Sequence, residues 1–207
     1  TRRAIAELTL LRMCEPRMSA SVDAQNALLS KREETVGLLK IGIVPQKAVL
    51  FKGTIRENLL WGNENATDDQ LWQALELAQA KEVVESKEGG LDAPVAQGGS
   101  NFSGGQRQRL TIARALVRKP GILILDDSAS ALDYATDAAL RKSIKALDSD
   151  MTVFIVSQRI SSVSSCDKIL VTEDGCLAGN GTHEELLSSN DVYREIYNSQ
   201  NGGAANE

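Results

Sequence analysis

From residue 41 onward, the chain contains short, continuous apolar runs separated by amphipathic segments. Ile41–Val44, Ile122–Leu125 and Val153–Val156 are three such runs with no polar alternation. The first predicts a brief strand, and the other two predict strands that are buried on both faces of a parallel sheet. Pro45 ends the first of them, because proline cannot continue a sheet ladder.

Polar caps and the helical spacing of apolar residues predict helices around these strands. Thr54 or a neighbour is expected to cap a helix toward Trp61, and Asp68 a second helix with one apolar face. A third helix, Gln106–Arg118, follows Ser103-Gly104-Gly105. Toward the C-terminus, the pattern predicts a helix, a hairpin and two last helices: 134–147, 168–172 with 176–179, His183–Ser188 and Val192–Ser199.

This alternation of strands and helices predicts an α/β fold. The main domain is expected to span residues 41–200, with a helical part at about 54–118. Residues 1–40 show no clear hydrophobic pattern beyond a short predicted helix at Ile5–Met13, and we interpret them as a degenerate or non-native segment. Residues 201–207 are expected to form a disordered tail.

Composition and charge restrict the possible functions of the chain more than they restrict its possible folds. A chain of 207 residues with a net charge of −5 suffices for one sizeable domain and argues against general nucleic-acid binding, which needs a clustered basic surface. The cysteines Cys14, Cys166 and Cys176 are too scattered for a disulfide framework or a zinc site, which favours a cytosolic setting. No apolar run is long enough to span a bilayer. Any membrane role is therefore expected from the cytosolic side, with another segment in the bilayer.

The segment Asn101–Arg109 carries the strongest functional signal. Ser103, Gly104 and Gly105 open a helix and expose several backbone N–H groups with no side chain in the way. The helix dipole adds partial positive charge, so the segment suits the outer phosphate of a nucleotide. A plain glycine-rich helix cap is the alternative interpretation of Ser-Gly-Gly alone. The full string Phe102–Leu110 resembles the signature motif of ATP-binding-cassette (ABC) ATPases residue for residue.

Two carboxylates, Asp126 and Asp127, follow the apolar run Ile122–Leu125. A carboxylate at the carboxyl end of a buried strand lies where α/β proteins bind ligands. Taken alone, such a sequence is more typical of an ordinary strand end. Because it follows the signature at the spacing of the family, Asp126 resembles the Walker B aspartate, which orders Mg²⁺ directly or through water.

Three further segments resemble the ABC family in the same order. Ile43–Gln46 resembles the Q-loop, whose glutamine contacts Mg²⁺ and senses the transport domain. Thr54–Asn58 resembles the exporter region that receives coupling helices, and Ser130–Asp133 resembles the D-loop that crosses between two nucleotide-binding domains. The resemblance implies a partial ABC-ATPase fold, similar to P-loop NTPases, with a mostly parallel sheet and a helical signature subdomain. It also implies ATP and Mg²⁺ as ligands, with Gln46 and Asp126 on the metal and with nucleotide contacts from Gln46, Ser103, Gly104, Gly105, Gln106, Asp126 and Asp133.

Two candidate catalytic residues, Asp127 and Gln158, depart from the family pattern. Asp127 stands where a glutamate is the general base, and its side chain is one methylene shorter, which is expected to cost orders of magnitude in rate. Gln158 stands where the family has a switch histidine; it can hydrogen-bond a γ-phosphate but carries no imidazole proton. The one histidine, His183, falls in a stretch that is structural in exporters. The combination resembles the catalytically weakened half of bacterial heterodimeric multidrug exporters.

A P-loop sequence, Gly-x-x-x-x-Gly-Lys-[Ser/Thr], does not occur in the chain. The best placement puts Leu8–Met13 on the helix that follows this loop in the family, so that Ala6 and Glu7 replace its Gly and Lys. Glu7 would repel the phosphates that a lysine holds. We therefore expect the Walker A region to be missing or degenerate and the isolated chain not to hydrolyse ATP.

The resemblance predicts an ATP-binding subunit or fragment of an ABC exporter at the cytoplasmic face of the cell membrane. Its expected partners are a second nucleotide-binding domain, which would form a heterodimer with it, and an exporter transmembrane domain. One alternative is a non-catalytic interaction module that pairs with a competent cassette without binding ATP alone. A soluble ABC ATPase of chromosome maintenance or DNA repair is a further alternative, but the chain lacks coiled-coil heptads and keeps the exporter-like Thr54–Asn58.

Overall fold

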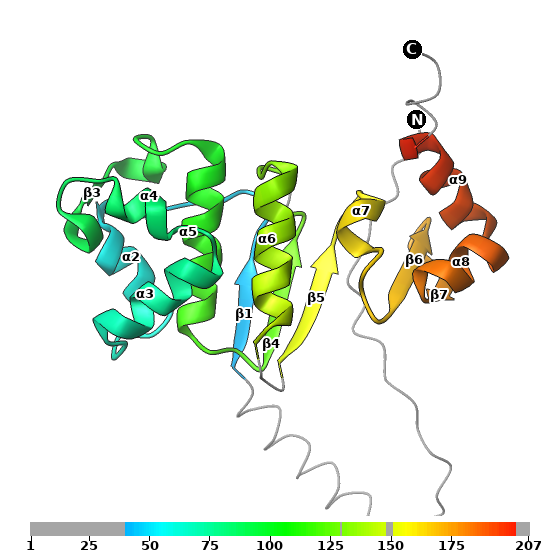
Figure 1. Cartoon of the computed structure of the whole chain (residues 1–207), viewed down its shortest axis with the longest axis horizontal. Coiled ribbons are helices and arrows are strands. Elements are labelled where there is room, and N and C mark those ends of the chain that lie inside the picture. The colour runs from blue at the N-terminus through cyan, green and yellow to red at the C-terminus, as the bar shows by residue number, and fades with distance from the viewer. Residues whose placement is uncertain (1–39, 129, 148–150, 202–207) are drawn as a thin grey trace, which may run out of the picture.

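The computed structural model describes residues 40–128, 130–147 and 151–201 (Figure 1). Three parallel strands form its central sheet in the order β1-β4-β5: Ile41–Val44, Ile122–Asp126 and Thr152–Val156. The predicted α/β class with a parallel sheet is confirmed. Each strand is followed by a loop at the same edge of the sheet, and these loops contain the candidate site.

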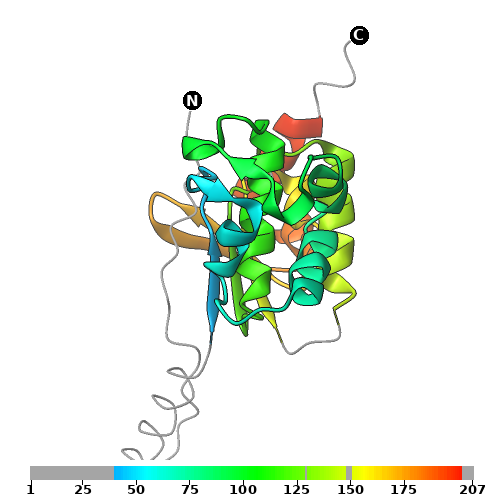
Figure 2. The ribbon, with the colours of Figure 1, turned by 90° about the vertical axis from the view of Figure 1, so that its left-hand side faces the viewer.

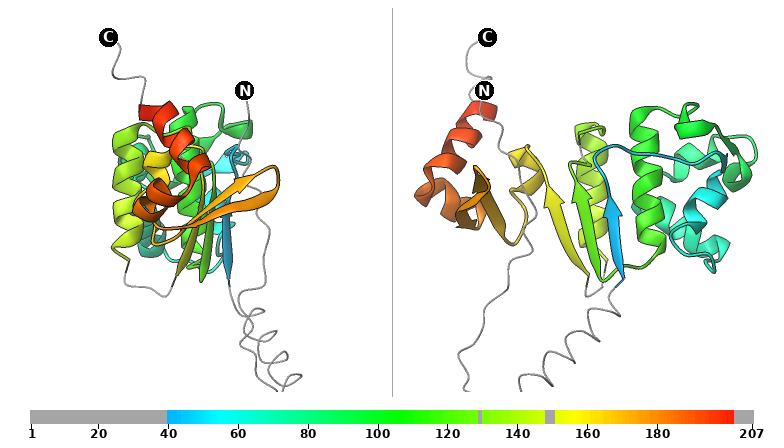
Figure 3. Two further views of the ribbon diagram at one scale, coloured as in Figure 1. Left: turned by 90° about the vertical axis from the view of Figure 1, so that its right-hand side faces the viewer. Right: turned by 180° about the vertical axis from the view of Figure 1, so that it is seen from behind.

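The sheet is fully buried on one face only, which corrects the prediction of strands buried on both faces. Leu123 and Leu125 are 0% and 3% exposed, whereas Ile43 and Phe154, which lie in register on the opposite face, are 61% and 41% exposed. The right-hand panel of Figure 3 looks onto this second face, over which none of the described helices lies. The apolar run in β5 is correspondingly half-exposed rather than buried.

A helical part lies beside β1 and is seen end-on in Figure 2. It contains four helices and a short two-stranded ribbon: α2 Ile55–Leu60, α3 Asp68–Leu77, α4 Lys81–Glu85, α5 Gly104–Val117, β2 Gly53–Thr54 and β3 Pro94–Val95. Helix α5 is buried over most of its circumference, because α2 and α3 pack on one side of it and β1 on the other. Helix α5 thereby connects the helical part to the sheet.

Helix starts follow the capping rule, with one correction. Thr54, Thr67 and Ser103 each accept a hydrogen bond from the backbone N–H three residues on, and a Glu or Gln at that position bonds back to the cap. The cap of α3 is therefore Thr67 rather than Asp68, because Asp68 is already helical. The short elements α4, β2 and β3, together with the 3₁₀ turns 90–92 and 97–99, fall in segments for which the sequence predicted only loops or no structure.

The C-terminal part follows β5. Helix α6 (Tyr134–Lys145) covers the buried face of the sheet in Figure 1, and the elements after β5 are α7 Ile160–Val163, β6 Ile169–Glu173, β7 Cys176–Gly181, α8 His183–Ser189 and α9 Asp191–Asn201. The hairpin β6–β7 and the last two helices agree with the sequence prediction, whereas α7 was not predicted. They enclose a small core of their own around Ile160, Val171 and Tyr193.

Candidate functional site

The candidate site begins where the three parallel strands end. Gln46 lies two residues beyond β1, Asp126 and Asp127 lie at and after the end of β4, and Gln158 lies two residues beyond β5. Because carboxyl ends of parallel strands share one edge, these four residues lie along that edge. The structure therefore places at one edge of the sheet the residues that the sequence predicted separately as Q-loop, Walker B and switch residues.

Gln46 and Asp127 are in direct contact. The Nε2 of Gln46 donates a hydrogen bond of 3.1 Å to the Oδ2 of Asp127. The backbone of Asp127 has a φ of 40°, in the left-handed region, and its N–H donates to the carbonyl of Val156 on β5. Its carbonyl accepts a bond of 2.8 Å from the Ser130 hydroxyl. Aspartate tolerates this backbone conformation better than most residues, so the turn and the short side chain are locally compatible.

Two residues at this edge, Gln46 and Asp126, carry oxygen donors. Mg²⁺ prefers oxygen ligands, and Asp126 is an exposed carboxylate at the strand end. The amide nitrogen of Gln46 is engaged by Asp127, and no donor among the described residues bonds to its Oε1. This oxygen of Gln46 and the Asp126 carboxylate are therefore available as ligands for a cation. Within the described residues there is no cluster of three His, Cys, Asp or Glu side chains suited to a metal.

The signature segment forms the first turn of α5. Ser103 accepts a hydrogen bond of 3.2 Å from the Gln106 N–H, and the Gln106 side chain accepts one of 3.0 Å from the Ser103 N–H. A Cβ added to Gly104 would lie 4.0 Å from its nearest neighbour, whereas one added to Gly105 would lie 3.1 Å from the carbonyl oxygen of Ala131. Gly104 therefore leaves the helix start open to a ligand, and Gly105 allows the signature helix to approach the D-loop of the same chain.

The loop before α5 is held by side chains to which the sequence analysis assigned no individual role. Asn101 accepts a bond from the Ala96 N–H and donates one of 2.8 Å to the Pro94 carbonyl. Arg107 donates a bond of 2.6 Å to the Phe102 carbonyl. The ring of Phe102 is buried, and the Lys87 ammonium lies 5.0 Å from its centroid. These contacts fix the entry into the signature turn.

Gln108 connects the signature helix to the Q-loop. Its side chain is 1% exposed, and its Nε2 donates a long hydrogen bond of 3.5 Å to the carbonyl of Pro45, the residue before Gln46. No donor among the described residues reaches its Oε1. The sequence contained this residue within the signature string, but only its burial against Pro45 shows the connection.

Asp133, at the end of the D-loop, is the N-cap of α6. Its carboxylate accepts hydrogen bonds from the backbone N–H and the hydroxyl of Thr136, at 2.9 and 2.8 Å. These bonds, the backbone bond first, hold the pKa of Asp133 below its ordinary value. The preceding Leu132 is buried. In this structure the carboxylate is therefore committed to the helix start, and its predicted nucleotide contact stays a prediction.

Gln158 has an exposed side chain that makes no hydrogen bond to another described residue, while its backbone carbonyl accepts a bond of 2.7 Å from Gln200. His183 is half-buried, and its Nδ1 makes a 2.8 Å contact with the hydroxyl of Tyr193, a residue of the C-terminal core. That position agrees with the structural interpretation of His183. Ala6, Glu7 and the rest of the predicted Walker A replacement lie outside the described residues, as do Cys14 and the tail 202–207.

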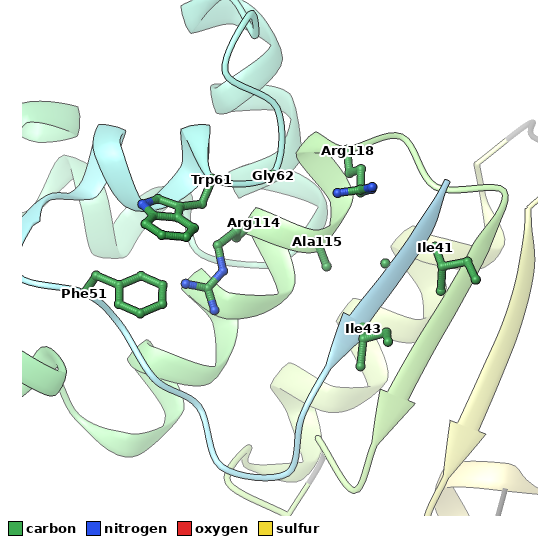
Figure 4. Close-up of a pocket in the computed structure, with 9 residues that line it drawn as sticks. Ile41, Ile43, Phe51, Trp61, Gly62, Arg114, Ala115 and Arg118 are labelled. Atoms are coloured by element: carbon green, nitrogen blue, oxygen red, sulfur yellow. The ribbon is translucent and has the colours of Figure 1, made fainter. Parts of the chain in front are cut away.

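A separate exposed surface lies between the helical part and β1, and Figure 4 shows the side chains that line it. The rings of Phe51 and Trp61 are stacked with centroids 4.7 Å apart, although Trp61 is 68% exposed. The Arg114 guanidinium lies 5.4 Å from the centroid of Phe51 and donates a bond to the Val49 carbonyl. Its NH1 has no acceptor among the described residues, and burial lowers the pKa of Arg114. We call Phe51, Trp61 and Arg114 the aromatic–arginine patch.

Residues 8–130 of the chain match a protein family described as ABC transporter. Over 168 residues the chain is 48% identical to "Uncharacterized ABC transporter ATP-binding protein YfiB" of Bacillus subtilis (strain 168), which covers 81% of this chain and 29% of YfiB. It is 46% identical over 160 residues to "Probable multidrug resistance ABC transporter ATP-binding/permease protein YheI" of the same organism, covering 77% and 27% of the two chains.

Among solved structures, "Structure of a bacterial Atm1-family ABC exporter with ATP bound" is similar with a TM-score of 0.75 and 35% sequence identity. That similarity covers 78% of this chain and 28% of the exporter chain. The chain thus spans less than a third of the length of the relatives it matches. No helix in the described ranges combines the length and the apolar character that crossing a membrane requires.

Proposed function

This chain belongs to the ABC transporter family, and on that premise we propose that it is an exporter nucleotide-binding domain whose signature completes the ATP site of a second, competent cassette. The observation that carries the proposal is the division of the chain into two half-sites. Gln46, Asp126, Asp127 and Gln158 gather at one edge of the sheet, while the open helix start at Ser103 and Gly104 makes no bond to them. A nucleotide at the signature therefore needs catalytic groups from another cassette.

In a pair with a second cassette, the chain's own strand-end site is expected to turn over ATP slowly. Mg²⁺, when bound by Gln46 and Asp126, would neutralise charge on the phosphates. Asp127 is the candidate general base, but its Oδ2 lies against the amide of Gln46 and its side chain is one methylene shorter than a glutamate. Because a general base must lie within about 3 Å of the proton it takes, this reach limits the rate. Gln158 can donate a hydrogen bond to a γ-phosphate but cannot take up a proton.

The aromatic–arginine patch is the proposed docking surface for the transmembrane part of the exporter. The relative YheI carries the name "ATP-binding/permease protein", and most of its length lies outside the region similar to this chain. Trp61 offers exposed apolar area, whereas the NH1 of Arg114 is a buried atom that has no acceptor among the described residues. The surface therefore fits a helical turn that presents an apolar side chain.

The proposal is tested by mixing the chain with a cassette that has an intact P-loop and a glutamate base, and measuring ATP turnover. We expect no turnover by the chain alone and stimulated turnover in the mixture. Ser103→Arg should abolish the stimulation, because the arginine fills the space in front of the helix start. Thr67→Arg is the matched control, since Thr67 is also an exposed capping-box N-cap and lies outside the signature.

Two outcomes decide against parts of the proposal. Equal loss of stimulation in both variants would show that capping, rather than the signature, matters. In a calorimetric titration of the chain alone, binding of Mg-ATP tighter than about 100 µM, or more than roughly 5 kcal/mol, would show that the chain holds ATP without a partner. Association that needs no ATP and produces no turnover would instead support the non-catalytic interaction module.

A further inference from the structure

The backbone that presents Gln158 is held by a residue from the other end of the domain. Gln200, in the last turn of α9, donates a hydrogen bond of 2.7 Å from its Nε2 to the carbonyl of Gln158. Its Oε1 accepts one of 2.9 Å from the N–H of Ile160. One carboxamide thus bridges the two backbone groups on either side of Arg159. Helices α7 and α9 are in contact, and Figure 1 shows them near each other.

Helix α7 needs this bridge because its own sequence supplies no cap. The first N–H groups of a helix have no partner within the helix and require an acceptor from outside. Arg159 occupies the N-cap position of α7 and makes no side-chain cap, because a guanidinium has no acceptor atom. The Gln200 oxygen satisfies the N–H of Ile160, the first helical residue, from 40 residues away.

The chemistry of the bridge selects glutamine. It requires one donor and one acceptor side by side at the end of the same side chain, and a carboxamide provides both. The segment is also held from α6, where Arg141 donates a bond of 2.7 Å to the carbonyl of Ser161. Within the segment, the Arg159 N–H donates to the Ser157 hydroxyl. The backbone at 157–161 is therefore fixed from both sides, while the Gln158 side chain stays exposed.

We propose that Gln200 is a positioning residue for the nucleotide site: it caps α7 from α9 and thereby fixes the direction in which Gln158 points. The inference rests on the proposed function for the role of Gln158 toward the γ-phosphate. Holding the backbone in advance lowers the ordering that Gln158 must undergo when nucleotide binds. The C-terminal helix is thus coupled to the switch position through one side chain.

The first test measures amide hydrogen exchange at Ile160 in the full chain. Gln200→Ala should raise the exchange rate of this amide by about tenfold, because the N–H loses its acceptor. Gln200→Glu keeps an acceptor and should leave Ile160 protected. Asn198→Ala is the control, because Asn198 is an exposed residue of α9 that makes no hydrogen bond to the backbone at 157–161. Unchanged exchange in Gln200→Ala overturns the inference.

The second test asks whether Gln200 acts through Gln158. Mg-ATP affinity is measured for the chain paired with a competent cassette, in the wild type, Gln200→Ala, Gln158→Ala and the double variant. We expect Gln200→Ala to weaken binding several-fold only when Gln158 is present, whereas additive effects overturn the positioning role. If the wild-type pair binds no more ATP than the competent cassette alone, the proposed function fails, and exchange at Ile160 alone decides whether Gln200 caps α7.

Discussion

At the scale of single residues, Gln108 is a buried polar side chain that joins two segments without adding much stability. Its amide nitrogen faces the Pro45 carbonyl at 3.5 Å, near the limit of a hydrogen bond, and its oxygen is buried without a donor among the described residues. A buried acceptor without a partner costs about 1–3 kcal/mol. The residue therefore contributes little net stability while it joins the signature helix to the Q-loop.

Replacing Gln108 separates these two effects. Gln108→Leu keeps most of the volume and removes the unsatisfied oxygen, so the free energy of unfolding should change by less than about 1 kcal/mol. Gln108→Ala leaves a cavity and should lower it by about 2 kcal/mol or more. Urea denaturation of the two variants and the wild type measures both. If Gln108→Leu and Gln108→Ala lowered the free energy of unfolding equally, the hydrogen bond to Pro45 would stabilise the fold by more than the unsatisfied oxygen costs.

At the scale of secondary-structure elements, Arg56 joins three pieces of the helical part. It lies on α2, pairs with Asp68 in the first turn of α3, and donates two hydrogen bonds to Asp92 in the 3₁₀ turn 90–92. The bonds from Arg56 hold the pKa of Asp92 below its ordinary value, and Asp92 in turn raises the pKa of Arg56. Since Thr54–Asn58 also resembles the exporter region that receives coupling helices, the same short helix carries both structure and proposed docking.

The contact between Arg56 and Asp92 predicts that the stability of the fold depends on pH. A carboxyl whose pKa is lowered by folding stabilises the folded state above its unfolded pKa, about 3.9, and loses that contribution as the pH falls through the lower folded value. Asp92→Asn should therefore reduce stability at pH 6 and make its decline below about pH 4 less steep. Urea denaturation across this range tests it. Asp69→Asn, in the first turn of α3 without a bond to Arg56, is the control and should leave the decline unchanged.

At the scale of the whole molecule, the three functional surfaces lie on different elements. The strand-end site lies at the carboxyl edge of the sheet, the signature begins α5, and the aromatic–arginine patch lies between the helical part and β1. Helix α5 connects all three, through Ser103 at its start, Gln108 toward the Q-loop and Arg114 in the patch. A rigid helix of this kind can transmit a shift at one surface to the other two.

Removing the exposed indole of the patch should affect assembly more than folding. Trp61→Ala loses the stacking on Phe51, so stability should fall by only about 1 kcal/mol. Binding to membranes that contain the transmembrane domain of an exporter relative should weaken by at least about tenfold, as expected for a central aromatic contact. Tyr134→Ala is the matched control, because Tyr134 is 72% exposed beside the D-loop and outside the patch. Equal binding by Trp61→Ala and the wild type would place the docking surface elsewhere.

The sequence by itself determined most elements from residue 41 onward, because the apolar runs, the caps and the signature string are local signals. It identified Gln46, Asp126, Asp127 and Gln158 one by one, each at the end of a predicted strand. It left out α4, α7 and the ribbon β2–β3, which are too short for a periodic pattern. It also treated the sheet as buried on both faces, since an apolar run records hydrophobicity and not which neighbours cover it.

Only the tertiary structure decided which of these residues meet. The contact of Gln46 with Asp127 joins positions 81 residues apart, and the Gln200 bridge joins positions 40 and 42 residues apart. Such contacts depend on the parallel order β1-β4-β5 and on the packing of α9 against α7, neither of which leaves a trace in local sequence. Local patterns fix what each segment can form, whereas the burial of those segments against one another fixes which side chains share a site.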